Sequence, residues 1–280
     1  MLKRAYIEIT NICNLRCSFC PGTGRKKEFM PPERFRLLAE KLRGHVKYLY
    51  LHVMGEPLLH PRLENILSIA ADLGFRVCLT TNGTLLGERG EAVLTARGVH
   101  KVSVSLHSAE GNGMEDMAEY LTAVWDFSRC AAEAGIICAL RLWNLGGAEE
   151  RNGEILSFLE ERVGCRPLSL PQPRQGSWKL GERLYLEQAE RFDWPDMAAP
   201  ETGTRFCLGL REQIAVLCDG TTAPCCLDHE GDVPLGNLYR QTLDEILDSP
   251  RARALYEGFS RGEAAETLCR RCGFARRFQK

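Results

Sequence analysis

Near the start of the chain a β-rich run leads directly into three cysteines, in the order Ala5-Tyr6-Ile7-Glu8-Ile9-Thr10-Asn11-Ile12-Cys13-Asn14-Leu15-Arg16-Cys17-Ser18-Phe19-Cys20. The C-x3-C-x2-C pattern lies in a loop after an expected strand at 5–9. Three thiolates at this spacing can bind three irons of a cubic iron–sulfur cluster and leave the fourth iron without a protein ligand. A structural zinc site is the alternative, but it needs four ligands, and this loop holds no fourth Cys or His.

Beyond this loop, β-rich runs alternate with helical segments up to residue 170. Six β/α units in succession indicate the α/β class, with a parallel sheet and helices outside it. Eight units would close a full barrel. The pattern therefore predicts a partial (β/α)6 TIM-type barrel with its site at the carboxyl ends of the strands. After the first strand, the expected strands are 46–53, 75–80, 99–106, 136–142 and 166–170, and the expected helices are 32–42, 61–73, 88–97, 114–134 and 149–163.

The rest of the chain is organised differently, so the barrel is assigned to residues 1–170. Residues 171–205 hold four prolines and two tryptophans, and we expect an irregular connection with one short helix near 185–192. Residues 206–280 are expected to form a small C-terminal α+β domain. It would contain a strand at 214–218, a hairpin turn at Asp219-Gly220 and a helix at 243–259.

The composition is that of an ordinary globular protein, with 44% apolar and 26% charged residues. A net charge of −1 does not provide the basic surface that binds a nucleic acid polymer. The sequence has no apolar run long enough to span a membrane. The N-terminus reaches Glu8 without the apolar segment of a signal peptide. These features predict a cytoplasmic, reducing location.

The thirteen cysteines indicate metal or redox chemistry, because disulfides are rare in a reducing compartment. Most of them gather at the two ends of the sequence, three in the first loop and six after residue 206. The other four lie singly in the middle, as ordinary core cysteines do: Cys78, Cys130, Cys138 and Cys165.

Four motifs at the expected strand ends resemble the radical S-adenosylmethionine (SAM) superfamily. The first loop fits the family pattern C-x3-C-x-aromatic-C, with Phe19 as the aromatic residue. Gly55-Glu56-Pro57 follows the second strand and resembles the family's GEP motif. Residues 80–83 end the third strand, and Ser105-Leu106-His107-Ser108 ends the fourth. A β/α barrel builds its site at such carboxyl ends.

The resemblance implies the cofactors and the chemistry. Cys13, Cys17 and Cys20 would ligate a [4Fe–4S] cluster, whose free iron would take the amine and carboxylate of SAM. Electron transfer into SAM would release a 5′-deoxyadenosyl radical, which would abstract a hydrogen from the substrate.

The resemblance also assigns residues to the SAM molecule. Glu56, flanked by Gly55 and Pro57, would hold the SAM amine through a charge-assisted hydrogen bond. Asn82 and Ser105 would contact the ribose or the carboxylate of SAM. Small polar residues also end strands for purely structural reasons, and that alternative stays open for both.

Two features depart from the family pattern. His107 stands where relatives usually carry an acid, and the downstream arginine of many relatives is missing. Arg141, at the end of the fifth expected strand, is the candidate partner for the SAM carboxylate, with a surface salt bridge as its alternative. His52 and His107 both end strands and are candidate acid/base groups near neutral pH. Each has the alternative of a hydrogen-bonded core histidine.

A second set of thiols, Cys207, Cys225, Cys269 and Cys272, comes from three separate segments. Four cysteines also suit structural zinc. Their spacing resembles the family's C-terminal twitch domain, a truncated SPASM domain, which implies one auxiliary [4Fe–4S] cluster. The family's G-x4-C spacing selects Cys225 rather than its neighbour Cys226. Such a fully ligated cluster would conduct electrons or form a wall of the site.

The function expected from these motifs is that of a SAM-dependent radical enzyme with a small-molecule substrate. A queuine-type deazapurine base, cleaved by a lyase reaction, is one candidate, and the absence of a domain before the first strand disfavours a peptide. A peptide- or sulfatase-type maturase and a small-molecule dehydrogenase are alternatives. A non-catalytic iron–sulfur electron carrier is an alternative of another class. The expected partners are the substrate and a flavodoxin- or ferredoxin-type electron donor, with no nucleic acid polymer and no membrane.

Overall fold

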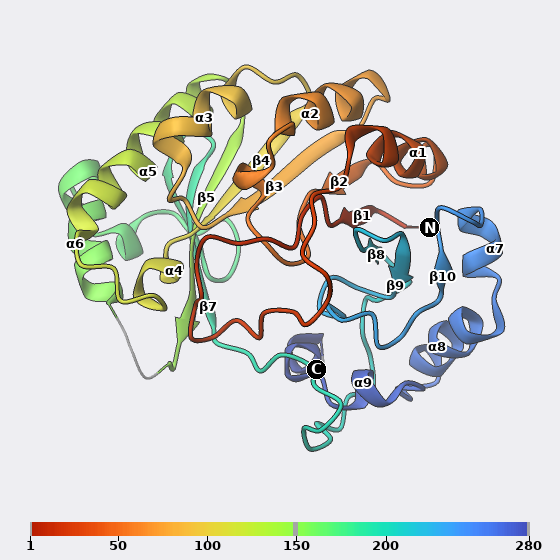
Figure 1. Ribbon diagram of the computed structural model, residues 1–280. Helices are drawn as coiled ribbons and strands as arrows, with labels where there is room; N and C mark the ends of the chain where they lie inside the picture. Colours follow the sequence, from red (N-terminus) through yellow and green to blue (C-terminus); the bar gives the residue numbers. More distant parts are fainter. Residues whose placement is uncertain (1, 148–150, 279–280) are drawn as a thin grey trace.

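A computed structural model describes residues 2–147 and 151–278, and ten strands of this part share one sheet (Figure 1). The strands are β1 (Arg4–Ile7), β2 (Tyr48–Tyr50), β3 (Arg76–Thr81), β4 (Val99–Ser105), β5 (Ile137–Leu145), β6 (Ser177–Gly181), β7 (Leu184–Glu190), β8 (Gln213–Val216), β9 (Thr221–Ala223) and β10 (Gly236–Asn237). The α-helices are α1 (Pro32–Leu42), α2 (Leu63–Asp72), α3 (Leu86–Leu94), α4 (His107–Glu110), α5 (Met117–Glu133), α6 (Asn152–Val163), α7 (Leu243–Leu247), α8 (Pro250–Ser260) and α9 (Thr267–Arg270). Short 3-10 helices lie at Pro57–Leu59, Pro167–Ser169 and Gly273–Phe278.

The central strands form the expected partial barrel. The order β1-β2-β3-β4-β5-β7 is parallel at every step, and α1, α2, α3 and α5 line its outer side (Figure 1). Helix α1 begins with Pro32, which suits a first helical turn, and it buries Phe35, Leu38 and Leu42 completely. The predicted α/β class with a partial TIM-type barrel is confirmed.

The sixth barrel strand is not the one that was expected. Residues 167–169 form a 3-10 helix instead of a strand, and β7 pairs with β5 in its place. The helix expected at 185–192 is therefore wrong. Leu184 and Leu186 are buried and Tyr185 between them is less so, which is the period-2 alternation of a strand. β6 completes an antiparallel hairpin with β7.

The C-terminal part extends the same sheet. β8 pairs in parallel with β1, and the antiparallel strands β9 and β10 follow. The helix expected at 243–259 is two helices, because Ser249 caps a new helix that begins at Pro250. The start of the helix expected at 149–163 lies partly outside the described residues, and α6 is described from Asn152. The segment limits at 170 and 205 stay predictions.

Alternate side chains of the barrel strands face the two sides of the sheet. Ala5 and Ile7 are fully buried in the core. Tyr6 lies between them in sequence and faces the inner side of the barrel. Its ring centroid is 4.8 Å from that of Tyr50 and 5.3 Å from that of His52. The inner face is therefore lined by aromatic and polar side chains near the carboxyl ends of β1 and β2.

Candidate functional site

The cysteine loop and the Gly55-Glu56-Pro57 loop pack directly against each other. The Glu56 backbone N–H donates to the Ile12 carbonyl at 2.8 Å. Gly55 has a φ of +77°, and a Cβ there would lie 2.5 Å from the Thr10 carbonyl oxygen and 2.8 Å from that of Ile12. Only glycine permits this close approach, so the GEP residues fix the chain as it enters the cysteine loop.

The Glu56 carboxylate is buried and joins two strand ends. One oxygen accepts from the Leu58 N–H at 3.0 Å, and the other accepts from the Asn82 N–H at 2.7 Å. Burial raises the pKa of this carboxyl group, and these two bonds lower it in part. Glu56 therefore fixes the ends of β2 and β3 in this structure. A carboxylate has about four acceptor positions, and the Thr81 side chain uses a third one, so one position remains for a cationic partner.

Two asparagines hold the cysteine loop. Asn82 donates to Asn14 Oδ1 at 2.9 Å and lies 3.9 Å from Cys13 Sγ. Asn112 donates to Cys17 Sγ at 3.1 Å and accepts from the Arg16 N–H at 2.8 Å. The Asn82 side chain thus contacts the loop. Asn112 was not identified from the sequence, where the only available signal is its place between Gly111 and Gly113.

Phe19 and His107 pack together beneath the loop, with ring centroids 5.0 Å apart. A Cβ on Gly111 would lie 2.6 Å from the Phe19 ring, so this glycine makes room for the aromatic residue. His107 Nδ1 lies 3.1 Å from the Arg141 carbonyl oxygen and 3.4 Å from the Trp143 backbone nitrogen. Burial lowers the pKa of His107 to about 4, so it is neutral at pH 7 and does not titrate where an acid/base role was expected.

Arg141 is a cation of the inner face. Ser105, the last residue of β4, is its register partner. The Arg141 guanidinium carbon lies 3.5 Å from the Trp143 ring centroid, and Arg277 lies over the same ring.

The Arg141 Nε is buried without a hydrogen-bond partner. Glu187, its register partner on β7, attracts it electrostatically but forms its ion pairs with Lys101 and Arg174. Burial lowers the pKa of Arg141 to about 10, so it remains charged at pH 7.

His52 lies near Arg141 on this inner face. Its Nδ1 is also buried without a partner in the described part of the chain. Burial, and then the Arg141 charge, lower the pKa of His52 to about 3. It is neutral at pH 7 and can act there as a hydrogen-bonding group, whereas the expected titration near neutrality does not occur.

The four C-terminal thiols lie close enough to influence one another. Burial raises the pKa of Cys225, and the neighbouring sulfurs of Cys226, Cys207, Cys272 and Cys269 raise it further. Cys226 contacts the Tyr6 hydroxyl, and burial raises its pKa to about 11, with a further contribution from Cys207. Both adjacent thiols are therefore near the set, and the choice of Cys225 as its fourth member stays a prediction.

Comparisons with known proteins decide the family. Residues 7–159 match the model of the Radical SAM superfamily. The chain belongs to the radical SAM superfamily. Residues 207–273 match the SPASM model, described as an iron-sulfur cluster-binding domain. SAM and a [4Fe–4S] cluster are the cofactors of this family, and the SPASM domain adds auxiliary iron–sulfur binding.

Curated relatives of this radical SAM protein differ in what their names describe. A GTP 3′,8-cyclase of Aquifex aeolicus is 40% identical over 116 residues, which cover 38% of this chain and 36% of that protein. The sporulation killing factor maturation protein SkfB of Bacillus subtilis is 24% identical over 86% of this chain and 63% of its own length. The chain thus spans between about a third and two thirds of these relatives.

Solved structures with the same fold cover almost the whole chain. BtrN in complex with AdoMet and 2-DOIA has a TM-score of 0.59 at 16% identity and covers 97% of this chain and 93% of its own. Native anSMEcpe with bound AdoMet and the Cp18Cys peptide has a TM-score of 0.63 at 13% identity and covers 98% and 90%. These likenesses establish the shared fold.

The donor set of the radical SAM protein fits the family's clusters. Three thiols lie in the first loop, of which Cys13 and Cys20 are exposed, and four lie together in the SPASM part. Across residues 2–147 and 151–278, no group of three Cys, His, Asp or Glu side chains converges as the ligands of a single metal ion would. In a [4Fe–4S] cluster each thiolate binds its own iron. The orphaned Nε of Arg141 suits an anionic group.

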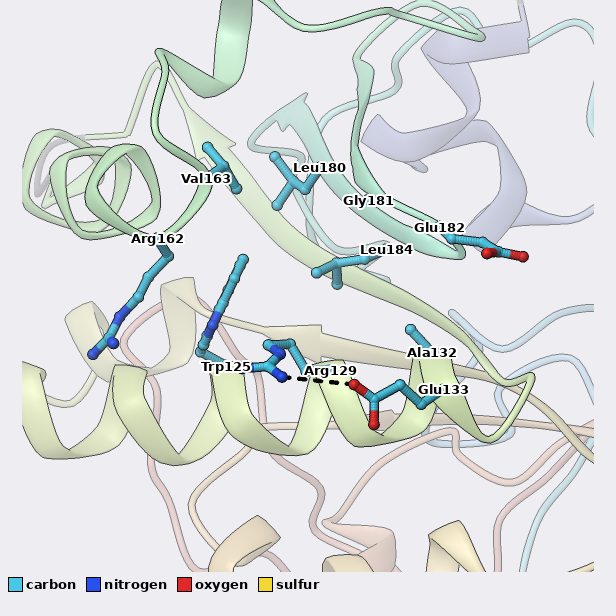
Figure 2. A pocket seen from close by; sticks show the side chains of 10 residues that line it. All are labelled: Trp125, Arg129, Ala132, Glu133, Arg162, Val163, Leu180, Gly181, Glu182 and Leu184. Carbon is cyan, nitrogen blue, oxygen red and sulfur yellow. Dashed lines mark ion pairs between the residues drawn. The ribbon is translucent and has the colours of Figure 1, made fainter.

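A pocket of about 330 Å³ lies away from this site, between α5, the end of α6 and the β6–β7 hairpin (Figure 2). Arg129 and Glu133 form an ion pair on its α5 side. It contains none of the residues predicted for SAM or for the clusters. Within the described residues, no helix combines the length and apolar character needed to cross a membrane.

Proposed function

We propose that this protein is a SAM-dependent radical enzyme that acts on a small-molecule substrate. The observation that carries the proposal is Arg141 on the inner face, whose buried Nε has no hydrogen-bond partner, near the strand ends that also position the cysteine loop. When bound, the cluster and SAM supply the reductive cleavage that yields a 5′-deoxyadenosyl radical.

The residues of the chain have separate tasks in this proposal. Cys13, Cys17 and Cys20 hold the cluster, and Asn112 donates a hydrogen bond to Cys17. Arg141 binds the carboxylate of SAM, because a buried guanidinium without an ion-pair partner gains from an anion. Ser105 lies beside Arg141 and contributes a hydroxyl. Glu56 receives the amine while it holds β2 and β3 together.

The substrate would lie on the inner face, near His52, Tyr6 and Tyr50. His52 stays neutral and offers a hydrogen bond from a buried nitrogen. Trp143 is already covered by Arg141 at 3.5 Å, so it is a poor stacking platform for a flat base. The likeness to BtrN, solved in complex with AdoMet and 2-DOIA, supports the choice of a small-molecule substrate. A queuine-type base stays one candidate.

A peptide substrate is the second candidate. SkfB, a maturation protein, and a PqqA peptide cyclase both align with most of this chain. For either substrate the auxiliary cluster held by Cys207, Cys225, Cys269 and Cys272 would conduct electrons. A flavodoxin- or ferredoxin-type protein would supply the first electron.

The test is SAM cleavage by the anaerobically reconstituted and reduced protein. The parent should form 5′-deoxyadenosine, whereas Cys17→Ala should form none and keep its C-terminal cluster. Cys130→Ala, which changes an exposed thiol outside both sets, is the matched control. An unchanged rate in Cys17→Ala would refute the cluster assignment. Screening small molecules against peptides for stimulated 5′-deoxyadenosine formation would separate the two substrate classes.

A further inference from the structure

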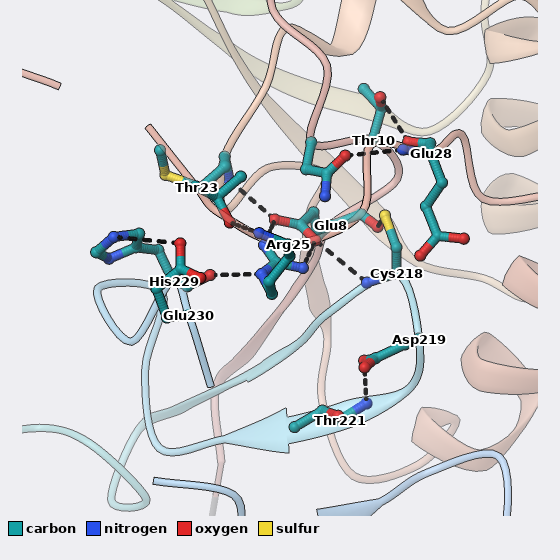
Figure 3. Close-up of polar contacts among 12 residues, drawn as sticks. Glu8, Thr10, Thr23, Arg25, Glu28, Cys218, Asp219, Thr221, His229 and Glu230 are labelled. Carbon is teal, nitrogen blue, oxygen red and sulfur yellow. Dashed lines mark hydrogen bonds and ion pairs between the residues drawn. The ribbon is translucent and has the colours of Figure 1, made fainter. Parts of the chain in front are cut away.

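A buried ion pair lies between the first cysteine loop and the SPASM part (Figure 3). Glu8 follows β1 directly and is fully buried. Its two carboxylate oxygens accept from the Arg25 guanidinium at 2.6 and 2.7 Å. Arg25 lies five residues after Cys20, so the pair fixes the returning arm of the cysteine loop to the end of β1.

The same guanidinium reaches the loop that carries Cys225. Arg25 Nε donates to the His229 carbonyl oxygen at 2.8 Å, and the neighbouring Gly24 N–H donates to Glu230 Oε1 at 3.1 Å. His229 lies four residues after Cys225. Two hydrogen bonds therefore join the arm of one thiol loop to the arm of the other (Figure 3).

Glu8 gathers two further segments. Its carboxylate accepts from the Met54 N–H at 3.3 Å, and Met54 directly precedes the GEP loop. It also accepts from the Cys218 N–H at 3.2 Å, and Cys218 lies two residues after the end of β8. The Cys218 thiol donates back to the Glu8 carbonyl oxygen at 3.0 Å. One carboxylate thus contacts the cysteine loop, the GEP loop and the SPASM part.

Aromatic contacts continue from His229 toward the last thiols. The His229 ring lies 5.4 Å from Trp194, Trp194 lies 5.6 Å from Phe192, and Phe192 lies 5.0 Å from Phe274. Phe274 is two residues after Cys272. The contacts from Arg25 therefore reach two of the three C-terminal segments that carry thiols, those of Cys225 and of Cys272.

A buried ion pair is a weak source of net stability, because removing both charges from water costs about as much as their attraction returns. Its clearest effect is to hold one arrangement of the groups around it. A cluster bound to either loop orders that loop, since metal binding to a site absent from the unfolded chain contributes folding energy. Arg25 is bonded to both loops, so order in one favours order in the other.

We propose that Glu8 and Arg25 are positioning residues that couple the two cluster-binding loops, so that occupancy of either cluster site stabilises the other. The proposal rests on the cluster assignments of the proposed function. The coupling must be reciprocal, because both sites bias the same set of contacts.

Hydrogen exchange read by mass spectrometry on the reconstituted protein tests this coupling loop by loop. Cys269→Ala should raise exchange in residues 13–28 at least about fivefold, the lower end of typical allosteric couplings. The triple change Cys13→Ala, Cys17→Ala and Cys20→Ala should do the same to residues 225–233. Both distant effects should disappear in an Arg25→Lys background, because lysine keeps the charge beside Glu8 but cannot bond Glu8 twice and His229 as well.

Two other variants make the result specific. Arg16→Lys, at an exposed position of the same loop, should leave both distant effects intact. Glu230→Gln removes a charge from the second bond between the loops, keeps the Glu8–Arg25 pair and should weaken the effects in part. The proposal would be overturned if the cysteine changes raised exchange in the opposite loop even with Arg25→Lys present. It would also be overturned if they did not raise it when Arg25 is intact. Iron analysis of the same samples reports separately whether the cluster assignments hold.

Discussion

Arg141 and His52 are the two residues of the inner face with a buried nitrogen that has no partner among the described residues. Such an atom costs about 1–3 kcal/mol when it stays unsatisfied. The sequence singled out both residues because they were expected at the ends of barrel strands, whereas β5 continues four residues beyond Arg141. It did not reveal that His52 and His107 are neutral at pH 7, since burial and the nearby Arg141 charge depend on the assembled barrel.

Arg141→Met should weaken SAM binding by about 1.5–3 kcal/mol, the range for a hydrogen bond to a charged group. Methionine keeps most of the apolar stem over Trp143 and removes the charge. Equilibrium dialysis of SAM against reconstituted protein measures the change. Arg129→Met on the outer side of α5 is the control and should bind SAM as the parent does. If Arg141→Met binds SAM with the same affinity as the parent, Arg141 is not the partner of the SAM carboxylate.

His52 should make stability depend on pH. Its pKa is about 3 in the fold and about 6.5 in the unfolded chain. The contribution of the buried neutral ring is full above pH 6.5 and is lost as the pH falls toward 3. Between pH 7.5 and 5.5 the parent should lose about 1 kcal/mol more unfolding free energy than His52→Gln. Denaturant unfolding at both pH values measures this, and an equal loss in the two proteins would contradict the assignment.

Among the elements, the cysteine loop was predicted well and β7 was not. The loop is defined by the spacing of its three cysteines, which is a local feature of the sequence. The GEP motif is also local, and its Gly55 packs against the loop. The strand β7 lies within the segment 171–205, whose four prolines suggested an irregular connection, and its pairing with β5 is non-local. The short run expected as the sixth strand, 166–170, contains Pro167, which suits a first helical turn and begins the 3-10 helix.

Leu186→Ala tests β7 as a buried strand of the barrel. Leu186 is fully buried, so the change should lower the unfolding free energy by about 2–5 kcal/mol. Leu168→Ala, at the exposed residue of the 3-10 helix expected as a strand, should cost less than about 0.5 kcal/mol. Chemical denaturation measures both variants. Comparable losses of unfolding free energy in the two variants would contradict the assignment of β7, rather than residues 166–170, as the sixth barrel strand.

At the scale of the whole molecule, strands of one continuous sheet lead into loops of both thiol groups. β1 leads into the first loop, and its neighbour β8 leads toward Cys225. Sequence separation hid this proximity, because the paired residues Arg4 and Gln213 are 209 positions apart. The thiols themselves were identifiable from spacing, whereas Asn112, Arg25 and Glu8 were found only once the loops were seen together.

The central claim is that the chain holds two iron–sulfur clusters, one in each thiol group. Iron, sulfide and zinc analysis of the anaerobically reconstituted parent and of the triple variant Cys13→Ala, Cys17→Ala and Cys20→Ala tests it most directly. The parent should carry about eight irons, and the triple variant about four, with matching sulfide and no zinc. One zinc and no iron in the triple variant would contradict the account, because the C-terminal thiols would then form a structural zinc site.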